Sequence, residues 1–337
     1  MNIAYSTNRT LIMPPLLPHI GSRTNFKFGG RPGRGYKEAN KVAIKDGEVV
    51  MGINRTEFPS WSEILDYGLI TAETGVYVMD IWEFMRTNYA GSLLYQTVGI
   101  DDMPAIISWS SFIDEFNTHF ENVTVARIGS AFALKDIDDA FKLYDEIAFE
   151  RIRRATLCFS PSNKLLDLLR ASIIHIPNHY VGVHIRFGDN YKLMKCNETK
   201  AEKEFIALIS SIRNANITKG SAVYLASKDD NAKRCFDGHS GSNFKVFALN
   251  DITNPLPTDE KLGVFNVSAV VPSFTDAMNE INLDMGTKYL LVDLMLVSLG
   301  QSYFFSRVSF RPKSSALQMI IEQRHEFREN YLRLILS

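Results

Sequence analysis

The second half of the chain alternates short apolar segments with longer amphipathic ones. Segments typical of buried strands stand at 180–185, 222–226, 244–249 and 302–305, and helical spacing of apolar residues fills the intervals, at 161–172, 201–212, 286–299 and 312–323. Strands that alternate with helices pair in parallel, because each return to the same edge needs a crossover connection, and the helices cover both faces of the sheet. The sequence therefore predicts an α/β fold.

The first half has a less regular pattern of the same kind. We expect strands at 10–13, 75–81 and 123–128, a short helix at 61–67, and helical spacing over 136–156. A chain of 337 residues is long enough for two domains. The change of pattern predicts domains at 1–160 and 161–337.

Charge and hydropathy exclude two classes of partner. The 37 basic and 38 acidic side chains give a net charge of −1, so no global positive field exists to hold a nucleic acid. The longest apolar stretch, at 289–305, is interrupted by Asp293 and Gln301. No apolar run reaches the roughly 20 residues that a membrane-spanning helix needs. We therefore predict no nucleic-acid partner and no membrane span.

The cysteine and histidine spacing gives no sign of a metal site. Three cysteines allow at most one disulfide, whose pairing stays open, and none is part of a C-x-x-C motif: Cys158, Cys196 and Cys235. His175 and His179 are four residues apart, but Pro177 between them prevents a continuous helix from presenting both. We expect no metal and no cofactor.

The sequence also bears on the cellular compartment. N-x-S/T sequons, which favour a lumenal protein, begin at six asparagines: Asn8, Asn54, Asn122, Asn197, Asn216 and Asn266. The N-terminal segment lacks the basic and apolar regions of a secretory signal. Either the protein is cytosolic or a preceding segment is missing.

The segment YVGVHIRFGDN, residues 180–190, ends a predicted buried strand with titratable side chains. Because side chains alternate along a strand, His184 and Arg186 should point to the same side, and Gly188 allows a sharp turn before Asp189. Ligands of open α/β sheets bind beyond the carboxyl ends of the strands, and a guanidinium is well shaped for a phosphate. This favours an anionic ligand. The alternative is a strand-end arginine paired with an acid, beside a half-buried packing histidine.

Four motifs together resemble a known family. They are NRTLIMPP at 8–15, VHIRFGD at 183–189, VYLASKDD at 223–230, and the segment from Asp293 to Ser309. The chain resembles the GDP-fucose-dependent fucosyltransferase superfamily, which includes the protein O-fucosyltransferases and the α1,6-fucosyltransferases. The resemblance implies a GT-B fold: two Rossmann-like domains facing a cleft, with the acceptor side in 1–160 and the GDP-sugar side in 161–337.

The resemblance also assigns roles to individual residues. Arg186 corresponds to the arginine that holds the diphosphate and stabilises the departing GDP, and His184 to a histidine near the guanine. Asp293 falls where the family reads the guanine N1–H and amine, although it could instead pair with Lys288 or a nearby loop. Ser309 and Phe310 resemble an element that meets the phosphates. The donor-binding set is completed by two acids, of which the second is equally explained as a solvated helix start: Asp189 and Asp230.

The implied function is the transfer of fucose from GDP-fucose to a hydroxyl of a protein or glycan, with inversion, in the ER or Golgi lumen. Family members begin with a strand and a G-x-x-N-Q turn, whereas Met1 falls inside the following helix, so this sequence names no general base. Three alternatives stay open: a non-catalytic nucleotide-sugar binder or structural member, a transferase using another nucleotide sugar, and an unrelated α/β protein. The acceptor and the oligomeric state are not indicated.

Overall fold

The computed structural model divides into two compact units, with the division between Ser162 and Asn163. It describes residues 1–13, 42–45, 48–51, 59–86, 95–98, 108–122, 125–128, 135–157, 161–185, 199–215, 217, 220–227, 230–241, 243–253, 263–305, 321–322 and 324–337. The arrangement of the two units about a cleft, and their acceptor and donor roles, stay predictions.

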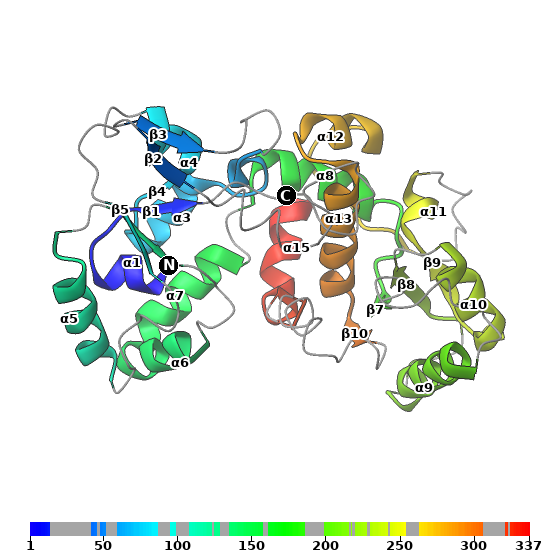
Figure 1. The fold of residues 1–337 in the computed structure, drawn as a ribbon. Helices are drawn as coiled ribbons and strands as arrows, with labels where there is room; N and C mark the ends of the chain where they lie inside the picture. The colour runs from blue at the N-terminus through cyan, green and yellow to red at the C-terminus, as the bar shows by residue number, and fades with distance from the viewer. Residues whose placement is uncertain are drawn as a thin grey trace. The chain divides into compact units, whose positions relative to one another are not determined.

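The second unit contains a four-stranded parallel sheet (Figure 1). Its strands lie in the order β10 (Ser302–Phe305), β7 (Tyr180–His184), β8 (Ala222–Ala226) and β9 (Lys245–Phe247). Every neighbouring pair is parallel. The predicted α/β class with parallel strands is confirmed.

Helices cover both faces of this sheet. On one side lie α9 (Thr199–Asn214) and α10 (Asp230–Ser240). They form a buried core with alternate residues of the strands, among them Val181, Val183, Val223 and Leu225. On the other side lies α13 (Met285–Leu299), which contacts both β7 and β8. The two helices α8 (Asn163–Ile173) and α15 (Arg328–Leu336) pack against α13. The result is a three-layer unit.

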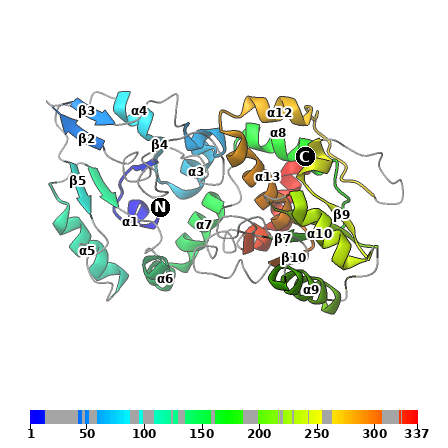
Figure 2. The ribbon, with the colours of Figure 1, turned by 45° about the vertical axis from the view of Figure 1, so that its right-hand side comes forward.

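The second unit also contains the short helices α11 (Leu249–Thr253) and α12 (Phe274–Glu280). Helix α12 lies alongside α8 in both views (Figures 1 and 2). The Ser273 side chain accepts from the backbone N–H of Asp276 at the start of α12, and Asp284 accepts from Thr287 at the start of α13. These capping contacts fix where each helix begins.

Helix α13 lies against β7 at unusually short range because position 182 is glycine. A Cβ at Gly182 would lie 2.2 Å from the carbonyl oxygen of Val297 and 2.7 Å from its Cα. A Cβ at Gly300 would in turn lie 2.5 Å from the backbone nitrogen of Gly182. The Tyr180 hydroxyl adds a hydrogen bond of 2.6 Å to the carbonyl of Leu296. Both glycines are therefore needed for this contact.

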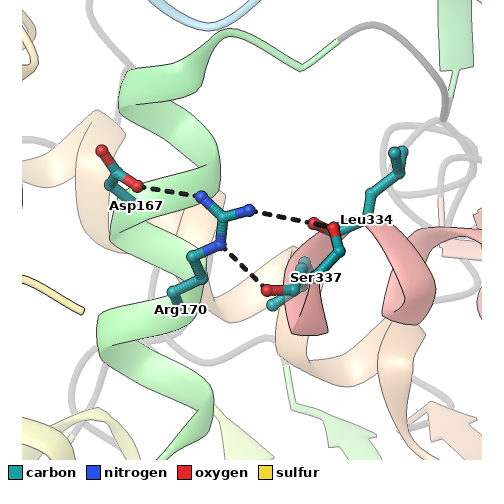
Figure 3. A network of polar contacts seen from close by, with 5 residues as sticks. Asp167, Arg170, Leu334 and Ser337 are labelled. Carbon is teal, nitrogen blue, oxygen red and sulfur yellow. Dashed lines mark hydrogen bonds and ion pairs between the residues drawn. The ribbon is translucent and has the colours of Figure 1, made fainter. Parts of the chain in front are cut away.

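Arg170 joins α8 to the C-terminal turn of α15 (Figure 3). Its Nε donates to the carbonyl of Ile335 at 2.9 Å, and one terminal nitrogen donates to that of Leu334 at 3.2 Å. The other terminal nitrogen pairs with Asp167 at 3.1 Å. The last carbonyls of a helix have no partner within the helix, so the guanidinium supplies donors that the backbone lacks.

The first unit contains three two-stranded pairings and seven helices among the described residues. Parallel pairs are formed by β1 (Leu11–Met13) with β4 (Val78–Asp80) and by β5 (Tyr95–Val98) with β6 (Val125–Ile128), and β2 (Val42–Lys45) pairs antiparallel with β3 (Glu48–Met51). The helices are α1 (Asn2–Ser6), η1 (Trp61–Glu63), α3 (Tyr67–Thr74), α4 (Ile81–Arg86), α5 (Trp109–His119), α6 (Lys135–Tyr144) and α7 (Glu146–Leu157).

An aromatic core joins α5 to α6 and α7 in this unit. Phe112, Phe120 and Phe141 are fully buried, and the Trp109 ring lies 4.8 Å from that of Phe141. Aromatic side chains bury large areas and prefer such tilted contacts. The cluster gives the first unit a hydrophobic core of its own.

Two segments expected to be helical in the first half have other bounds in the structure. The helix expected at 61–67 is a 3-10 turn followed by α3, because the Asp66 side chain caps Leu69 and starts a new helix. The helical spacing over 136–156 covers two helices, since Asp145 accepts from the backbone N–H of Ala148 at 2.9 Å and begins α7. Both differences arise from capping side chains, which apolar periodicity does not report.

Two other expectations need adjustment. The strand expected at 75–81 is limited to β4, and helix α4 begins at Ile81. Most of the helix expected at 312–323 lies outside the described residues. Within the described part of the chain, no helix is long and apolar enough to cross a bilayer.

Replacing Gly182 by alanine should destabilise the second unit. The added Cβ would collide with the Val297 backbone, which can move only with α13. Overpacking of this kind costs about 1–3 kcal/mol, and backbone collisions fall at the upper end. Urea unfolding followed by circular dichroism measures the loss.

The matched control for that variant is Gly238→Ala in α10. A Cβ at Gly238 has no atom within 4 Å. Alanine is favoured over glycine inside a helix by roughly 0.5–1 kcal/mol, so this variant should be neutral or slightly stabilised. Equal behaviour of the two variants would contradict the proposed role of Gly182.

Replacing Arg170 by methionine should also lower the free energy of unfolding. Methionine keeps the apolar stem of the side chain but removes three donors, and hydrogen bonds from a charged group contribute about 1.5–3 kcal/mol. Solvent can reach part of this surface, so we expect a loss of about 1–2 kcal/mol by urea unfolding. The same change at exposed Arg213 on α9 should alter stability by less than about 0.5 kcal/mol.

Candidate functional site

Three strands of the second unit end at the same level. In the parallel register, Phe305 of β10 pairs with His184 of β7, which pairs with Ala226 of β8. The ladder continues one step further, where the Ile185 N–H donates to the carbonyl of Ala226 at 2.9 Å. Carboxyl ends of parallel strands form the usual ligand-binding edge of an α/β sheet. The candidate site is this edge.

His184 is the last residue of β7 and is 8% exposed. Its ring makes an edge contact with Phe305, with 6.2 Å between ring centroids. By alternation it shares a face with Tyr180 and Gly182, which is the face covered by α13. His184 therefore stands at the candidate edge, on the α13 side of the sheet.

The remaining residues predicted to bind the donor can be located only by their sequence distance from described strands and helices. Asp230 is the first residue of α10, after β8. Arg186 follows Ile185 directly, and Ser309 comes four residues after Phe305. Four of the predicted residues lie outside the described part of the chain, so their positions stay predictions: Arg186, Asp189, Ser309 and Phe310.

Asp293 lies on α13 and bonds to the sheet. Its Oδ1 accepts a hydrogen bond of 2.7 Å from the hydroxyl of Tyr224, the central residue of β8. Burial raises the pKa of Asp293 to about 7, although the hydrogen bond from Tyr224 acts in the opposite direction. Asp293 as a whole residue is half-buried.

The sequence did not indicate Tyr224 as the partner of Asp293. Lys288, the partner considered, is buried and donates to the carbonyl of Met278. Tyr224 is fully buried, and burial together with the negative charge of Asp293 raises its pKa far above the usual range, so the hydroxyl stays protonated and donates. A tyrosine in a buried strand needs a hydrogen-bond partner for its hydroxyl, and this requirement is the sequence feature that could have indicated Tyr224.

A second polar group follows β8 and β9. Lys233 of α10 contacts both carboxylate oxygens of Asp251 of α11, at 2.8 and 2.7 Å. Asp251 also accepts from the backbone N–H of Ala248 at 2.7 Å, directly after β9. These contacts fix the connection after β9 beside Tyr224, whose pKa the charge of Asp251 helps to raise. Neither Lys233 nor Asp251 was indicated by the sequence as part of a site.

The described residues contain no cluster of three or more His, Cys, Asp or Glu side chains that could hold a metal ion. The polar side chains described at the edge can recognise a ligand by hydrogen bonds. A carboxyl group with one oxygen held by Tyr224 can accept N–H donors with its other oxygen. The buried imidazole of His184 adds a ring whose nitrogens can donate or accept hydrogen bonds.

Comparisons with known proteins give distant similarities to solved structures. No family model matches the sequence, and no curated protein does. Among solved structures, the chain is similar to POFUT1 in complex with GDP, with 9% identity, a TM-score of 0.44, and coverage of 97% of this chain and 90% of that one. Two further POFUT1 structures, the apo form and the complex with GDP-fucose, match with 10% identity and TM-scores of 0.43 and 0.42. They cover 96% and 97% of this chain and 88% of each POFUT1 chain.

Replacing Asp293 by asparagine should change how stability depends on pH. The folded pKa of about 7 lies above the ordinary value of about 3.9, so the folded protein binds the extra proton between these two values. The free energy of unfolding of the natural protein should therefore fall as pH rises from about 4 to about 7. Asparagine keeps the acceptor for Tyr224 without a charge. With allowance for solvent exposure, we expect the variant to be more stable by about 1–2 kcal/mol at pH 8.

Urea unfolding at a series of pH values measures this difference. Tyr224→Phe provides a companion variant: it removes the hydrogen bond that lowers the pKa of Asp293, so the fall in its stability should continue to higher pH. Parallel pH profiles for the natural protein and Asp293→Asn would show that Asp293 does not titrate in this window.

Proposed function

We propose that the second unit binds GDP-fucose at the carboxyl ends of β10, β7 and β8, and that the chain transfers fucose to a hydroxyl group with inversion. The observation that carries this proposal is the common level at which the three strands end. Arg186 follows one of these strands, Ser309 follows another, and Asp230 follows the third. The residues that carry the family motifs thus follow strands that end at the same edge of the sheet.

Asp293 and His184 would recognise the guanine base. A carboxylate can accept the N1–H and the exocyclic amine of guanine together, a pair of donors that uracil and adenine do not offer in this form. Tyr224 holds one oxygen of Asp293 and so fixes the orientation of the carboxyl group. Guanine binding would favour the ionised form, since charge-assisted hydrogen bonds are stronger than neutral ones.

Arg186 would act on the leaving group. In the transfer, the acceptor oxygen forms a bond to the anomeric carbon while the bond from that carbon to the phosphate oxygen breaks, so negative charge develops on the departing GDP. A guanidinium held at the diphosphate stabilises this charge more in the transition state than in the bound substrate, which raises the rate. Because the cation is part of the protein, the proposal requires no metal.

The other predicted residues have supporting roles. Ser309 and Phe310 would meet the phosphates after β10, and Asp189 and Asp230 would contact the donor. The first unit would hold the acceptor, a protein or a glycan, and the expected compartment is the lumen of the ER or Golgi. The acceptor hydroxyl proton leaves to a base that is not assigned.

The test is calorimetric titration of GDP, GDP-fucose and UDP into the purified chain. We expect binding of both guanine nucleotides and none of UDP. In Arg186→Ala the affinity for GDP should fall about 10- to 150-fold, since one charged hydrogen-bonding group contributes about 1.5–3 kcal/mol. Arg213→Ala, which removes an exposed arginine from α9, is the matched control and should bind GDP unchanged.

The outcomes separate the alternatives. Equal binding of GDP and UDP would indicate another nucleotide sugar, and no binding by a folded sample would overturn the proposal. Selective GDP binding without release of GDP from GDP-fucose in the presence of acceptor glycans or proteins would identify a non-catalytic member.

A further inference from the structure

Three asparagines that begin N-x-S/T sequons are described by the structure, and all three are exposed. Asn8, Asn122 and Asn266 lie in turns or irregular segments rather than in helices or strands. No side-chain hydrogen bond of any of the three is recorded within the described part of the chain. Their amide groups can therefore carry a large substituent without loss of an internal contact.

The surroundings of Asn266 show how such a substituent would fit. The preceding residue, Phe265, is 8% exposed and packs edge-on against the ring of Tyr180. Two residues further on, the Ser268 N–H donates to the carbonyl of Leu336 at 2.9 Å. The segment is thus fixed on both sides of Asn266 while the Asn266 side chain faces solvent.

Asn8 and Asn122 occupy one region of the first unit. Between them, Arg9 donates to the carbonyl of Phe120 at 2.9 Å, which brings the two turns together. Asn8 has a φ of 53°, in the left-handed region that asparagine adopts more readily than most residues. The backbone therefore presents Asn8 outward from a tight turn after α1.

An independent observation concerns the redox environment. Cys235, on α10, is disulfide-bonded, and its partner lies outside the described residues. Disulfides persist in oxidising compartments and are rare in the cytosol. Transfer of oligosaccharides to N-x-S/T sequons occurs in the same kind of compartment, since the motif marks surface loops of secreted proteins.

We propose that Asn8, Asn122 and Asn266 carry N-linked oligosaccharides. In this modification the Nδ2 atom of asparagine forms a bond to the anomeric carbon of a lipid-diphosphate-linked oligosaccharide. The bond from that carbon to the diphosphate breaks, the lipid diphosphate leaves, and the amide loses a proton. The proposal goes beyond the proposed function and is independent of it, because neither the sugar-nucleotide edge nor any residue assigned to it takes part.

The experiment uses the full chain, directed into the endoplasmic reticulum of cultured eukaryotic cells by a cleavable leader. The purified protein is treated with peptide N-glycosidase in heavy-oxygen water, which converts each occupied asparagine into isotopically labelled aspartate. Peptide mass spectrometry should show the label at Asn8, Asn122 and Asn266. Asn279, equally exposed on α12 but followed by Glu280 and Ile281, is the internal control and should carry no label.

Variants at the hydroxyl position of each sequon give a matched second readout. Thr10→Ala and Ser268→Ala should each remove one glycan and increase gel mobility by one step. Thr10→Ser and Ser268→Thr keep the sequon and should leave mobility unchanged. The changes are made at Thr10 because glutamine at position 8 would be strained at a positive φ. Asn122→Gln removes the third glycan.

Thiol alkylation without reduction tests the compartment argument separately. Of the three cysteines, one should react and two should be protected. A folded, secreted protein without label at the three asparagines would overturn the proposal, and label at only some of them would overturn it for the others. Three reactive thiols in that protein would remove the disulfide argument.

Discussion

The contact between α13 and β7 at Gly182 is the constraint on which the second unit depends. Strand and helix approach so closely there that the space of a single methyl group is already filled by the backbone of Val297. The same contact sets the height of α13 over the sheet, and with it the positions of Leu296 and Asp293, which bond to tyrosines of β7 and β8. The packing of α13 against β7 therefore sets the position of Asp293, and no ligand is needed to hold it there.

The pairing of Asp293 with Tyr224 shows how a carboxyl group can stand over an apolar sheet. A buried carboxylate without donors would cost several kcal/mol, and one tyrosine hydroxyl supplies only part of what water would. The raised pKa of Asp293 is the sign of this deficit. A ligand with two adjacent N–H groups would relieve it, and this is the physical link between an imperfectly solvated carboxyl group and the recognition of guanine that we propose.

The sequence predicted the strands of the second unit well because each is marked by the residues within and directly beside it. The bounds of β8 and β10 are those expected, since uniformly apolar strands are flanked by clear turns and helices. The first unit was predicted poorly, because Asp66 and Asp145 start helices by capping, and a cap is one residue in a pattern that spans many. At the site, the sequence indicated His184 and Asp293 by type and position, but it could not show Tyr224 beneath Asp293, because that contact joins residues 69 positions apart.

Strand order has a consequence for how the second unit assembles. Strand β7 is the first strand of the unit and pairs with β8, which pairs with β9, so these three can form as the chain continues. The opposite edge must wait for β10, which comes near the end of the chain and returns to β7 across the whole intervening length. Closing so long a loop is entropically unfavourable and slows folding. The α13–β10 segment, with Gly300 between the helix and the strand, docks onto β7 at Gly182, and only this docking brings Tyr180 and Tyr224 their partners on α13.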